Sequence, residues 1–507
     1  MDRKLAAYGT YLLQLELMKK MVLLGGGRWA RVLMSVLADV LPADWRILWI
    51  TQHGRQAAEL WCREQQQQQY VQQPMNAPRA ADWIEVAAEV SDAQLSHVQA
   101  AIVATSPHTH GYWLQRLLQA QVPTLCEKPL VLDSQQAVEL ERQAIAANCP
   151  LGVNLELHYA TYVEEFARRV GDLETSLATA LPAQTADMLD DAERRATLPA
   201  QTSDMIDDAE RRATLSHQPQ LAKSQVRLVE LQWLDPWSEV RYGETKYSDV
   251  YTNIVDDMFP HCWSLLRHAT GVEDWHVVQV EYLLNSNVQI SLVQGDVSAK
   301  ITLSRRALKR TRRLSVHLSA EDFQTDQMGA GNILSNLDSP ALDSPALVTS
   351  ALDTAGFGSS RFAAELDFSP EPGAIVQAGE RIELQWHGER PLTRSLKSFL
   401  GVLDAHGQGD QQAWKSWPLS IVSCRESVSV STAIAKQLHR AQQQWLDRCS
   451  AGDEACSGSD SAAFRRRLLF DMFVPIAAAA GQRVEFTDPQ QLQAFYDSIA
   501  QRSHWTL

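Results

Sequence analysis

The sequence predicts two domains: an α/β domain built on a parallel sheet, followed by an α+β domain whose sheet is largely antiparallel. Short apolar runs alternate with amphipathic stretches as far as residue 155, which is typical of strand–helix units around a parallel sheet. After residue 226 the apolar runs have a period of two and few helical stretches separate them, as in antiparallel sheets. A chain of 507 residues also exceeds what one hydrophobic core usually holds.

The first domain is expected over residues 21–155. Its strands are predicted, in order, at residues 21–24, 45–51, 82–86, 100–104, 124–126 and 151–155. Its helices are predicted at residues 29–40, from 56 into the glutamine run, at 112–120 and at 134–148. Residues 1–20 precede the first strand and are interpreted as an N-terminal extension.

The second domain is expected over residues 156–445. One helix is predicted at about residues 256–268, among the strand-like segments VRLVELQWL, WHVVQVEYL, VQISLV, SAKITLS and RRLSVHLS. Tandem copies of LPAQT and of LDSPA mark two expected surface inserts, at about 171–222 and 328–355. Residues 446–507 are expected to form a helical extension.

Composition and charge argue against several classes of partner. The net charge of −15 opposes nucleic-acid binding, which needs clustered cations. The basic stretch Arg305–Arg313 alternates with apolar residues and is interpreted as the solvated face of a strand or turn. No apolar run or N-terminal pattern predicts a membrane span or a signal peptide. Seven scattered cysteines without a CxxC pair predict no metal site and favour a cytoplasmic location.

A glycine-rich turn follows the first predicted strand. Gly25, Gly27 and Ala30 form the pattern GxGxxA, with Arg28 and Trp29 between the last two, and a predicted helix follows. The first glycine permits a tight turn, the second lets the backbone approach a pyrophosphate, and the alanine lets helix and strand pack closely. The N-terminus of the helix offers N–H groups to phosphates. This context predicts a Rossmann-type dinucleotide site; the alternative is a turn that serves packing alone.

The end of the second predicted strand indicates which dinucleotide is bound. Sites that prefer NAD usually place an acidic residue here for the ribose 2′-hydroxyl. The segment Thr51–Arg55 contains no acid, and Thr51, His53 and Arg55 are suited to a 2′-phosphate. NADP(H) is therefore the preferred prediction, with NAD(H) as the second choice. The alternative interpretation is that these are solvated loop residues.

Residues 101–133 carry a family resemblance. A strand ends in a turn with Thr105, Ser106, Pro107 and His110, and the next strand ends in Glu127, Lys128 and Pro129. Together with GxGxxA, this resembles the glucose–fructose oxidoreductase/inositol dehydrogenase (Gfo/Idh/MocA) family, although Ser106 is an insertion before the proline. The resemblance implies that Thr105, Ser106, Pro107, His110, Glu127 and Lys128 adjoin the cofactor.

The same resemblance implies hydride transfer between the nicotinamide and a substrate carbon. The lysine of Glu-Lys-Pro, here Lys128, lies beside both in the family and donates a hydrogen bond or proton to the reacting oxygen. Burial is expected to lower the pKa of Lys128 towards neutrality, as proton transfer requires. The alternative is an ordinary solvated lysine at a strand end.

A second family signal is an aspartate followed four residues later by a histidine. Asp257 and His261 have this spacing, which places them on one face of a helix. His261 is predicted to act as general acid or base, with Asp257 orienting it or contacting substrate. Phe259 and Ser264 depart from the family pattern of glycine and aspartate, and Pro260 leaves Asp256 open as the alternative partner.

Further side chains are candidates for lining the substrate pocket, with surface polarity or core packing as the alternative for each. They are Asn154, Glu156, His158, Tyr159, Tyr242, Lys246 and Tyr247, together with Trp233, Trp237 and Trp263 for stacking.

The predicted function is an NAD(P)H-dependent oxidoreductase acting on a sugar or cyclitol, with the second domain binding substrate and forming a homodimer or homotetramer. The alternatives are an imine reductase of the thiazolinyl imine reductase type and a non-catalytic NADP(H)-binding sensor.

Overall fold

The computed structural model describes residues 18–72, 84–180, 226–241, 244–283, 286–318 and 363–451, with residues 467–472, 474–475 and 478 near the C-terminus. The expected extension before residue 18, the LPAQT and LDSPA repeats and most of the expected C-terminal extension lie outside these residues. Helix α7 (Thr161–Ala180) runs through residue 171, where the first insert was expected to begin.

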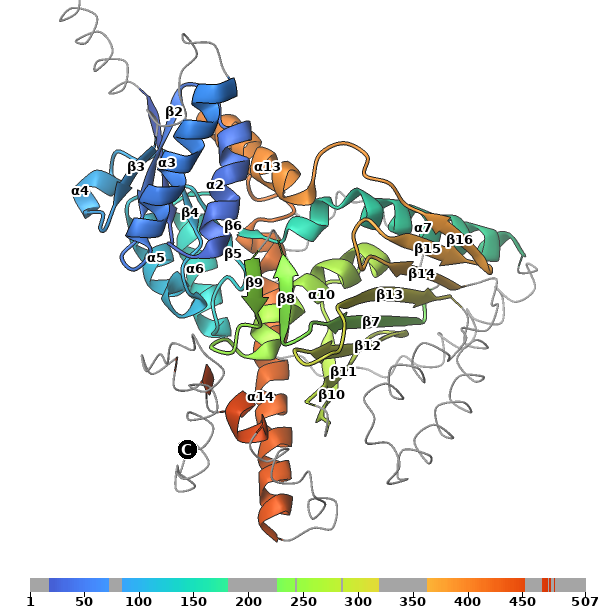
Figure 1. Ribbon diagram of the computed structural model, residues 1–507. Helices are drawn as coiled ribbons and strands as arrows, with labels where there is room; N and C mark the ends of the chain where they lie inside the picture. Colours follow the sequence, from blue (N-terminus) through green and yellow to red (C-terminus); the bar gives the residue numbers. More distant parts are fainter. Residues whose placement is uncertain are drawn as a thin grey trace, which may run out of the picture.

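The first domain is a six-stranded parallel sheet covered by helices (Figure 1). The strands lie in the order β3-β2-β1-β4-β5-β6. Their bounds are β1 (Lys19–Leu24), β2 (Trp45–Ile50), β3 (Ile84–Ala87), β4 (Ala100–Val103), β5 (Thr124–Glu127) and β6 (Leu151–Asn154). The helices are α2 (Arg28–Val40), α3 (Arg55–Gln72), α4 (Asp92–Leu95), α5 (Pro107–Gln119) and α6 (Ser134–Ala146).

This arrangement confirms the predicted α/β domain. Every residue of β4, β5 and β6 is buried, as expected of parallel strands covered on both faces. The strand order reverses between β1 and β4, so the carboxyl ends of these two strands border the crevice where such sheets bind ligands. The first strand begins at Lys19, two residues before the predicted start.

The second domain contains an eight-stranded sheet in the order β10-β11-β12-β7-β13-β14-β15-β16. All neighbours are antiparallel except β12 and β7, which confirms the predicted α+β domain. The strands are β7 (Leu228–Leu234), β10 (His276–Tyr282), β11 (Val288–Gln294), β12 (Val297–Ser304), β13 (Thr311–His317), β14 (Ala363–Asp367), β15 (Ala374–Gln377) and β16 (Glu380–Glu383).

The sheet is contacted by α7, α10 (Ile254–Thr270) and α14 (Ile421–Ala451). The 3₁₀ turn η2 (Glu156–Tyr159) and α13 (Pro391–Gly407) contact each other, and α13 also contacts α2 of the first domain (Figure 1). A separate hairpin of β8 (Ser238–Arg241) and β9 (Glu244–Tyr247) lies beside α10.

Residues late in the chain complete the edge of the first sheet. Val153 N–H donates to Leu419 O at 2.8 Å, and Gly152 forms a bridge with Ser420. Trp417 packs over Gly152, where a Cβ atom would lie 2.1 Å from the indole ring. These contacts join β6 to residues that follow α13. A domain boundary at residue 155 therefore separates residues that pack together.

Part of the C-terminal segment packs on the second domain. Asp471 accepts hydrogen bonds from the Tyr282 hydroxyl at 2.8 Å and from Arg306 Nη2 at 3.1 Å. Phe470 is buried in a small apolar cluster with Val250 and Val474. These contacts tie Asp471 to β10 and to the loop after β12, and Phe470 and Val474 to Val250.

Replacement of Gly152 tests the contact between β6 and Trp417. Gly152→Ala is expected to lower the free energy of unfolding by about 1–3 kcal/mol, because the added methyl group overpacks the indole. The control is Gly171→Ala in α7, where no atom lies within 4 Å of the new Cβ; alanine there should stabilise by about 0.5–1 kcal/mol. Denaturant unfolding of both variants checks this, and equal effects would contradict it.

Candidate active site

The glycine turn after β1 is built by close backbone contacts. Gly25 has φ = +133°, and a Cβ there would lie 2.2 Å from Ala104 O. Gly25 N–H donates to Ile50 O at 2.9 Å, and its carbonyl accepts from Trp49 Nε1 at 2.6 Å. Only glycine fits position 25, where the carboxyl ends of β1, β2 and β4 meet.

Gly27 differs from its neighbour because it borders open space. It is the N-cap of α2 with an extended backbone (φ −75°, ψ 176°), and no described atom lies within 4 Å of a Cβ built on it. The first turn of α2 has no acidic residue and no side-chain cap. Ala30 is fully buried, while Arg28 and Trp29 are on the first turn of the helix. The N–H groups of this turn are therefore suited to an anionic group.

Sequence analysis missed a second pair of glycines in this region. A Cβ on Gly26 would lie 1.8 Å from Thr51 Oγ1, and one on Gly54 would lie 2.4 Å from Gly26 O. Thr51 is buried and its Oγ1 accepts a hydrogen bond from Gly54 N–H at 3.0 Å. The turns after β1 and β2 thus pack backbone to backbone. The available signal was a glycine soon after each strand end.

Arg55, predicted to bind a 2′-phosphate, begins α3 and is exposed. Its Nε donates to Glu59 Oε1 at 2.7 Å on the same helix. His53 is exposed as well. Arg55 and His53 are accessible from solvent at the carboxyl end of β2, whereas the Thr51 hydroxyl is engaged in the turn.

The Thr105–His110 turn is held by the buried ring of His110. Ser106 is the N-cap of α5 and Pro107 is its first residue. His110 is completely buried, with Nδ1 2.8 Å from Pro129 O and Nε2 3.2 Å from Thr105 O. Burial lowers the pKa of His110, so the ring is uncharged. His110 therefore joins two loops at the site through their backbones.

Glu127 connects β5 to the second domain. Its buried carboxylate accepts from Asn154 Nδ2 at 2.6 Å, and Asn154 Oδ1 accepts from Ser395 Oγ of α13 at 2.7 Å. Burial raises the pKa of Glu127, and hydrogen bonds from Asn154 and Trp29 oppose this rise. No local sequence pattern distinguished Ser395, which lies 241 residues from its partner.

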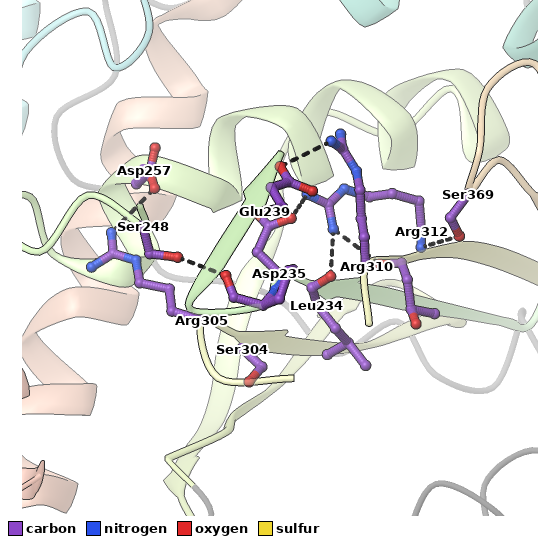
Figure 2. Close-up of polar contacts among 12 residues, drawn as sticks. Leu234, Asp235, Glu239, Ser248, Asp257, Ser304, Arg305, Arg310, Arg312 and Ser369 are labelled. Carbon is purple, nitrogen blue, oxygen red and sulfur yellow. Dashed lines mark hydrogen bonds and ion pairs between the residues drawn. The ribbon is translucent and has the colours of Figure 1, made fainter. Parts of the chain in front are cut away.

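Lys128 and Asp257 meet across the domain boundary. Lys128 Nζ donates to Asp257 Oδ1 at 2.8 Å and to Asp257 O at 2.7 Å. Arg305 Nη2 lies 3.2 Å from Asp257 Oδ2 (Figure 2). Arg305 Nη1 donates to Thr252 O. One carboxylate is therefore shared by two cations.

The charge state of Lys128 differs from the prediction. Burial by itself would lower its pKa, but attraction to Asp257, with smaller contributions from Glu156 and Glu127, raises the pKa above the ordinary lysine value. Burial would likewise raise the pKa of Asp257, yet Lys128 and Arg305 hold it well below its usual range. At neutral pH both groups are ionised, so the expected lowering of the Lys128 pKa was wrong.

His261 lies one helical turn after Asp257 in α10. The helix continues through Pro260, and its N-cap Asn253 accepts from Val255 N–H at 2.8 Å. The His261 ring is buried against Trp233, with ring centroids 5.0 Å apart and planes 9° apart. Nδ1 is buried without a partner among the described residues, so Asp257 orients Lys128 rather than His261. Burial, followed by the charge of Lys128, lowers the pKa of His261 well below 6.5.

Two more acids of this region are protonated more readily than usual. Burial raises the pKa of Glu156 to about 8, and repulsion from Glu127 adds to the rise. Burial also raises the pKa of Asp256 to about 7. Glu156 interacts electrostatically with Lys128, which supports its predicted place near the pocket.

The other pocket candidates are placed differently. His158 and Tyr159 contact His268 and Ser398, at the junction of η2 with α10 and α13. Trp263 is buried and donates to Glu273 O, and Tyr247 is exposed. Lys246 interacts electrostatically with Asp257, Arg306 lies over the ring of Trp237, and Tyr242 lies outside the described residues. The two substituted family positions, Phe259 and Ser264, are both buried.

The interpretation of Arg305–Arg313 as a solvated face was wrong. Arg312 is 2% exposed and its Nη2 bonds Asp235 Oδ1 at 2.5 Å (Figure 2). Arg310 pairs with Glu239 at 3.5 Å. These arginines extend from the loop after β12 into β13, and their carboxylate partners lie on other elements, where sequence spacing does not reveal them.

Residues 19–155 match the Gfo/Idh/MocA family model, described as "Oxidoreductase family, NAD-binding Rossmann fold". The match confirms the predicted resemblance, and the first domain belongs to this family. The chain is accordingly an oxidoreductase that uses a nicotinamide dinucleotide. A comparison with curated proteins finds no match.

Solved structures are similar to the chain at low identity. A UDP-N-acetylglucosamine 3-dehydrogenase from Acidithiobacillus ferrooxidans is 15% identical over 83% of this chain and 97% of that chain, with TM-score 0.47. The 3-ketoreductase KijD10 from Actinomadura kijaniata, in complex with NADP and TDP-benzene, is 12% identical over 83% and 98%, with TM-score 0.47. A Gfo/Idh/MocA family oxidoreductase from Vibrio cholerae is 12% identical over 85% and 99%, with TM-score 0.47.

Among the described residues, no helix is long and apolar enough to cross a membrane. No group of three or more His, Cys, Asp or Glu side chains among them is arranged to hold a metal ion.

The raised pKa of Glu156 predicts a pH dependence of stability. The folded chain keeps a proton on Glu156 up to about pH 8, whereas the unfolded chain releases it near 4.5. Because the folded state binds more protons in this window, the free energy of unfolding falls as pH rises through it. Relative to wild type, Glu156→Gln should gain on the order of 3 kcal/mol at pH 8 and almost nothing at pH 4.

Denaturant unfolding at several pH values measures this effect. Glu85→Gln, which replaces an exposed carboxylate on β3, is the control and should change little at any pH. A Glu156→Gln variant whose stability runs parallel to wild type from pH 4 to 8 would contradict the assignment.

Proposed function

We propose that this oxidoreductase interconverts a hydroxyl and a carbonyl group on a sugar or cyclitol, with Lys128, Asp257 and His261 as its catalytic residues. The observation that carries the proposal is the meeting of Lys128, from the dinucleotide-binding domain, with Asp257, from α10 of the second domain. His261 follows Asp257 by one helical turn on the same helix. A substrate held between the domains would thus reach both groups.

The glycine turn fits a dinucleotide cofactor. Open space at Gly27 and uncapped N–H groups at the start of α2 suit a pyrophosphate. Thr105, Ser106 and Pro107, at the carboxyl end of β4, flank the same crevice. When bound, the nicotinamide cofactor accepts or supplies the hydride. Exposed Arg55 and His53, with no acid after β2, support NADP(H) over NAD(H).

The charges of the site divide the proton chemistry between two residues. Lys128 is an ammonium group and can donate a hydrogen bond to a substrate oxygen as negative charge develops on it. His261 is uncharged and can accept the proton of a hydroxyl group undergoing oxidation. Asp257 holds Lys128 in place and balances its charge. In carbonyl reduction the Lys128 ammonium group is the protonated group at neutral pH that can supply the proton to the substrate oxygen.

The imine reductase alternative keeps one specific observation in its favour. Ser264 replaces the acid that the family resemblance expects and is 2% exposed, so it is poorly placed to hold a sugar hydroxyl. Trp233, the candidate for stacking on a heterocyclic substrate, is buried and contacts His261 and Arg312, so it adds no support to this alternative. Parallel screens with sugars, cyclitols and cyclic imines separate the two functions. Homodimer or homotetramer formation through the eight-stranded sheet, and a cytoplasmic location, stay predictions.

Cofactor binding is tested at Gly27. Gly27→Ala should keep the melting temperature of wild type, because its Cβ meets no described atom, but should bind reduced nicotinamide cofactor about tenfold more weakly. Energy transfer from tryptophan to bound NADPH or NADH measures affinity, with Gly171→Ala as the control. Undiminished affinity would place the pyrophosphate elsewhere, and tighter binding of NADH than of NADPH would overturn the cofactor preference.

The catalytic assignment is tested at Lys128. Lys128→Ala should bind cofactor like wild type and lose about 10²–10⁴-fold in turnover, the usual contribution of a positioned proton donor. The measurement follows reduced nicotinamide absorbance with the best substrate of the screens. Lys397→Ala, at an exposed lysine of α13, is the control. Turnover that survives loss of Lys128 would sink the assignment.

A further inference from the structure

The orientation of His261 depends on an aromatic contact. A catalytic imidazole is ordinarily held by a hydrogen bond at its second ring nitrogen. In His261 the Nδ1 atom is buried, and within the described part of the chain it has no hydrogen-bond partner. The ring instead stacks on Trp233 of β7 at 5.0 Å between centroids and 9° between planes. Packing against the indole is therefore the visible restraint on the ring.

Trp233 is in turn fixed by Arg312. The two residues are directly paired in the register of β7 and β13, and the guanidinium lies 3.8 Å from the centroid of the indole ring. Arg312 Nη1 donates to Leu234 O at 2.9 Å and to Thr311 O at 3.0 Å, and Nη2 donates to Asp235 (Figure 2). A cation fixed over an aromatic face in this way restricts both groups.

The charges that face His261 come from four elements. Lys128 after β5, Arg312 on β13 and Lys246 on β9 are cations, and each disfavours a second positive charge on the imidazole. Asp257, on the same helix as His261, opposes them. Three cations against one carboxylate, around a buried ring, favour the uncharged imidazole.

We propose that Asp235, Arg312 and Trp233 are positioning residues that fix the His261 imidazole for proton transfer, with the buried Arg312 cation disfavouring a second positive charge on the ring. The catalytic part of this inference rests on the function proposed for His261. The contact of His261 with Trp233 does not rest on that function, because it concerns where the imidazole ring lies and how readily the ring takes up a proton.

Nuclear magnetic resonance of the full chain tests the electrostatic part without a substrate. The 14 histidines are labelled with ¹³C, and His261→Asn identifies the His261 signal. Two variants are compared. Arg312→Gln combined with Asp235→Asn removes the buried cation together with its carboxylate partner, and Arg312→Lys keeps the cation but loses the planar stack. We expect the charge-free variant to take up its His261 proton about one pH unit higher than wild type, a tenfold change in proton affinity.

Trp233 tests the positioning part. Trp233→Phe keeps an aromatic face and should retain turnover within a few fold, whereas Trp233→Leu should lower kcat about tenfold or more while cofactor affinity stays unchanged. In Trp233→Leu the His261 signal should also broaden or divide, because the ring gains orientations. Arg312→Lys is the second variant should the double variant fail to fold, and it should show the same loss of a single ring orientation.

The possible results separate the two claims. An unchanged His261 titration, together with an unchanged His261 signal in Trp233→Leu and Arg312→Lys, overturns the inference. Full turnover by His261→Asn, with the titration shifted as expected, instead removes the proposed catalytic role of His261 and leaves the stack as a structural restraint on that ring.

Discussion

The half-buried ion pair between Lys128 and Asp257 is the contact on which the rest of the site depends. Lys128 is placed by β5 of the first sheet, and Asp257 by the first turn of α10 in the second domain. Removing Lys128 leaves Asp257 with Arg305 as its remaining cationic partner, and removing Asp257 leaves the Lys128 ammonium group without its carboxylate. The pair therefore fixes the relative position of the two domains at the point where chemistry is proposed, and it sets the charges that Glu156 and His261 experience.

Further ion pairs and hydrogen bonds surround this pair. Arg305 shares the Asp257 carboxylate, and the adjacent Arg306 pairs with Asp471 in the C-terminal segment. On the other side, Glu127 reaches Ser395 through Asn154. Lys128, Arg305 and Glu127 thus each have a partner on a different element. Hydrogen bonds and ion pairs between different elements hold side chains in one arrangement more firmly than contacts between neighbours on one helix do.

Sequence reasoning succeeded where the signal is local. Buried parallel strands give short apolar runs, and Gly25, Lys128, Asp257 and His261 stand in recognisable patterns. It failed where the partner is remote: Arg305 lies 48 residues from Asp257, and Arg312 lies 77 residues from Asp235. In the sequence alone these carboxylate partners cannot be recognised, and arginines that alternate with apolar residues then resemble the solvated face of a strand. The pKa of Lys128 was predicted in the wrong direction for the same reason, because burial was considered without its counter-ion.

The edge of the first sheet has a consequence for the biosynthesis of the protein. Residues 19–155 match a family model for this domain, yet β6 obtains its outer neighbour from Leu419 and Ser420, and Asn154 obtains its partner from Ser395. Until the ribosome has released these later residues, the nascent domain presents an open strand edge, the feature through which unfinished chains pair with one another. The outer edge of β6 is therefore completed only after most of the chain has been synthesised.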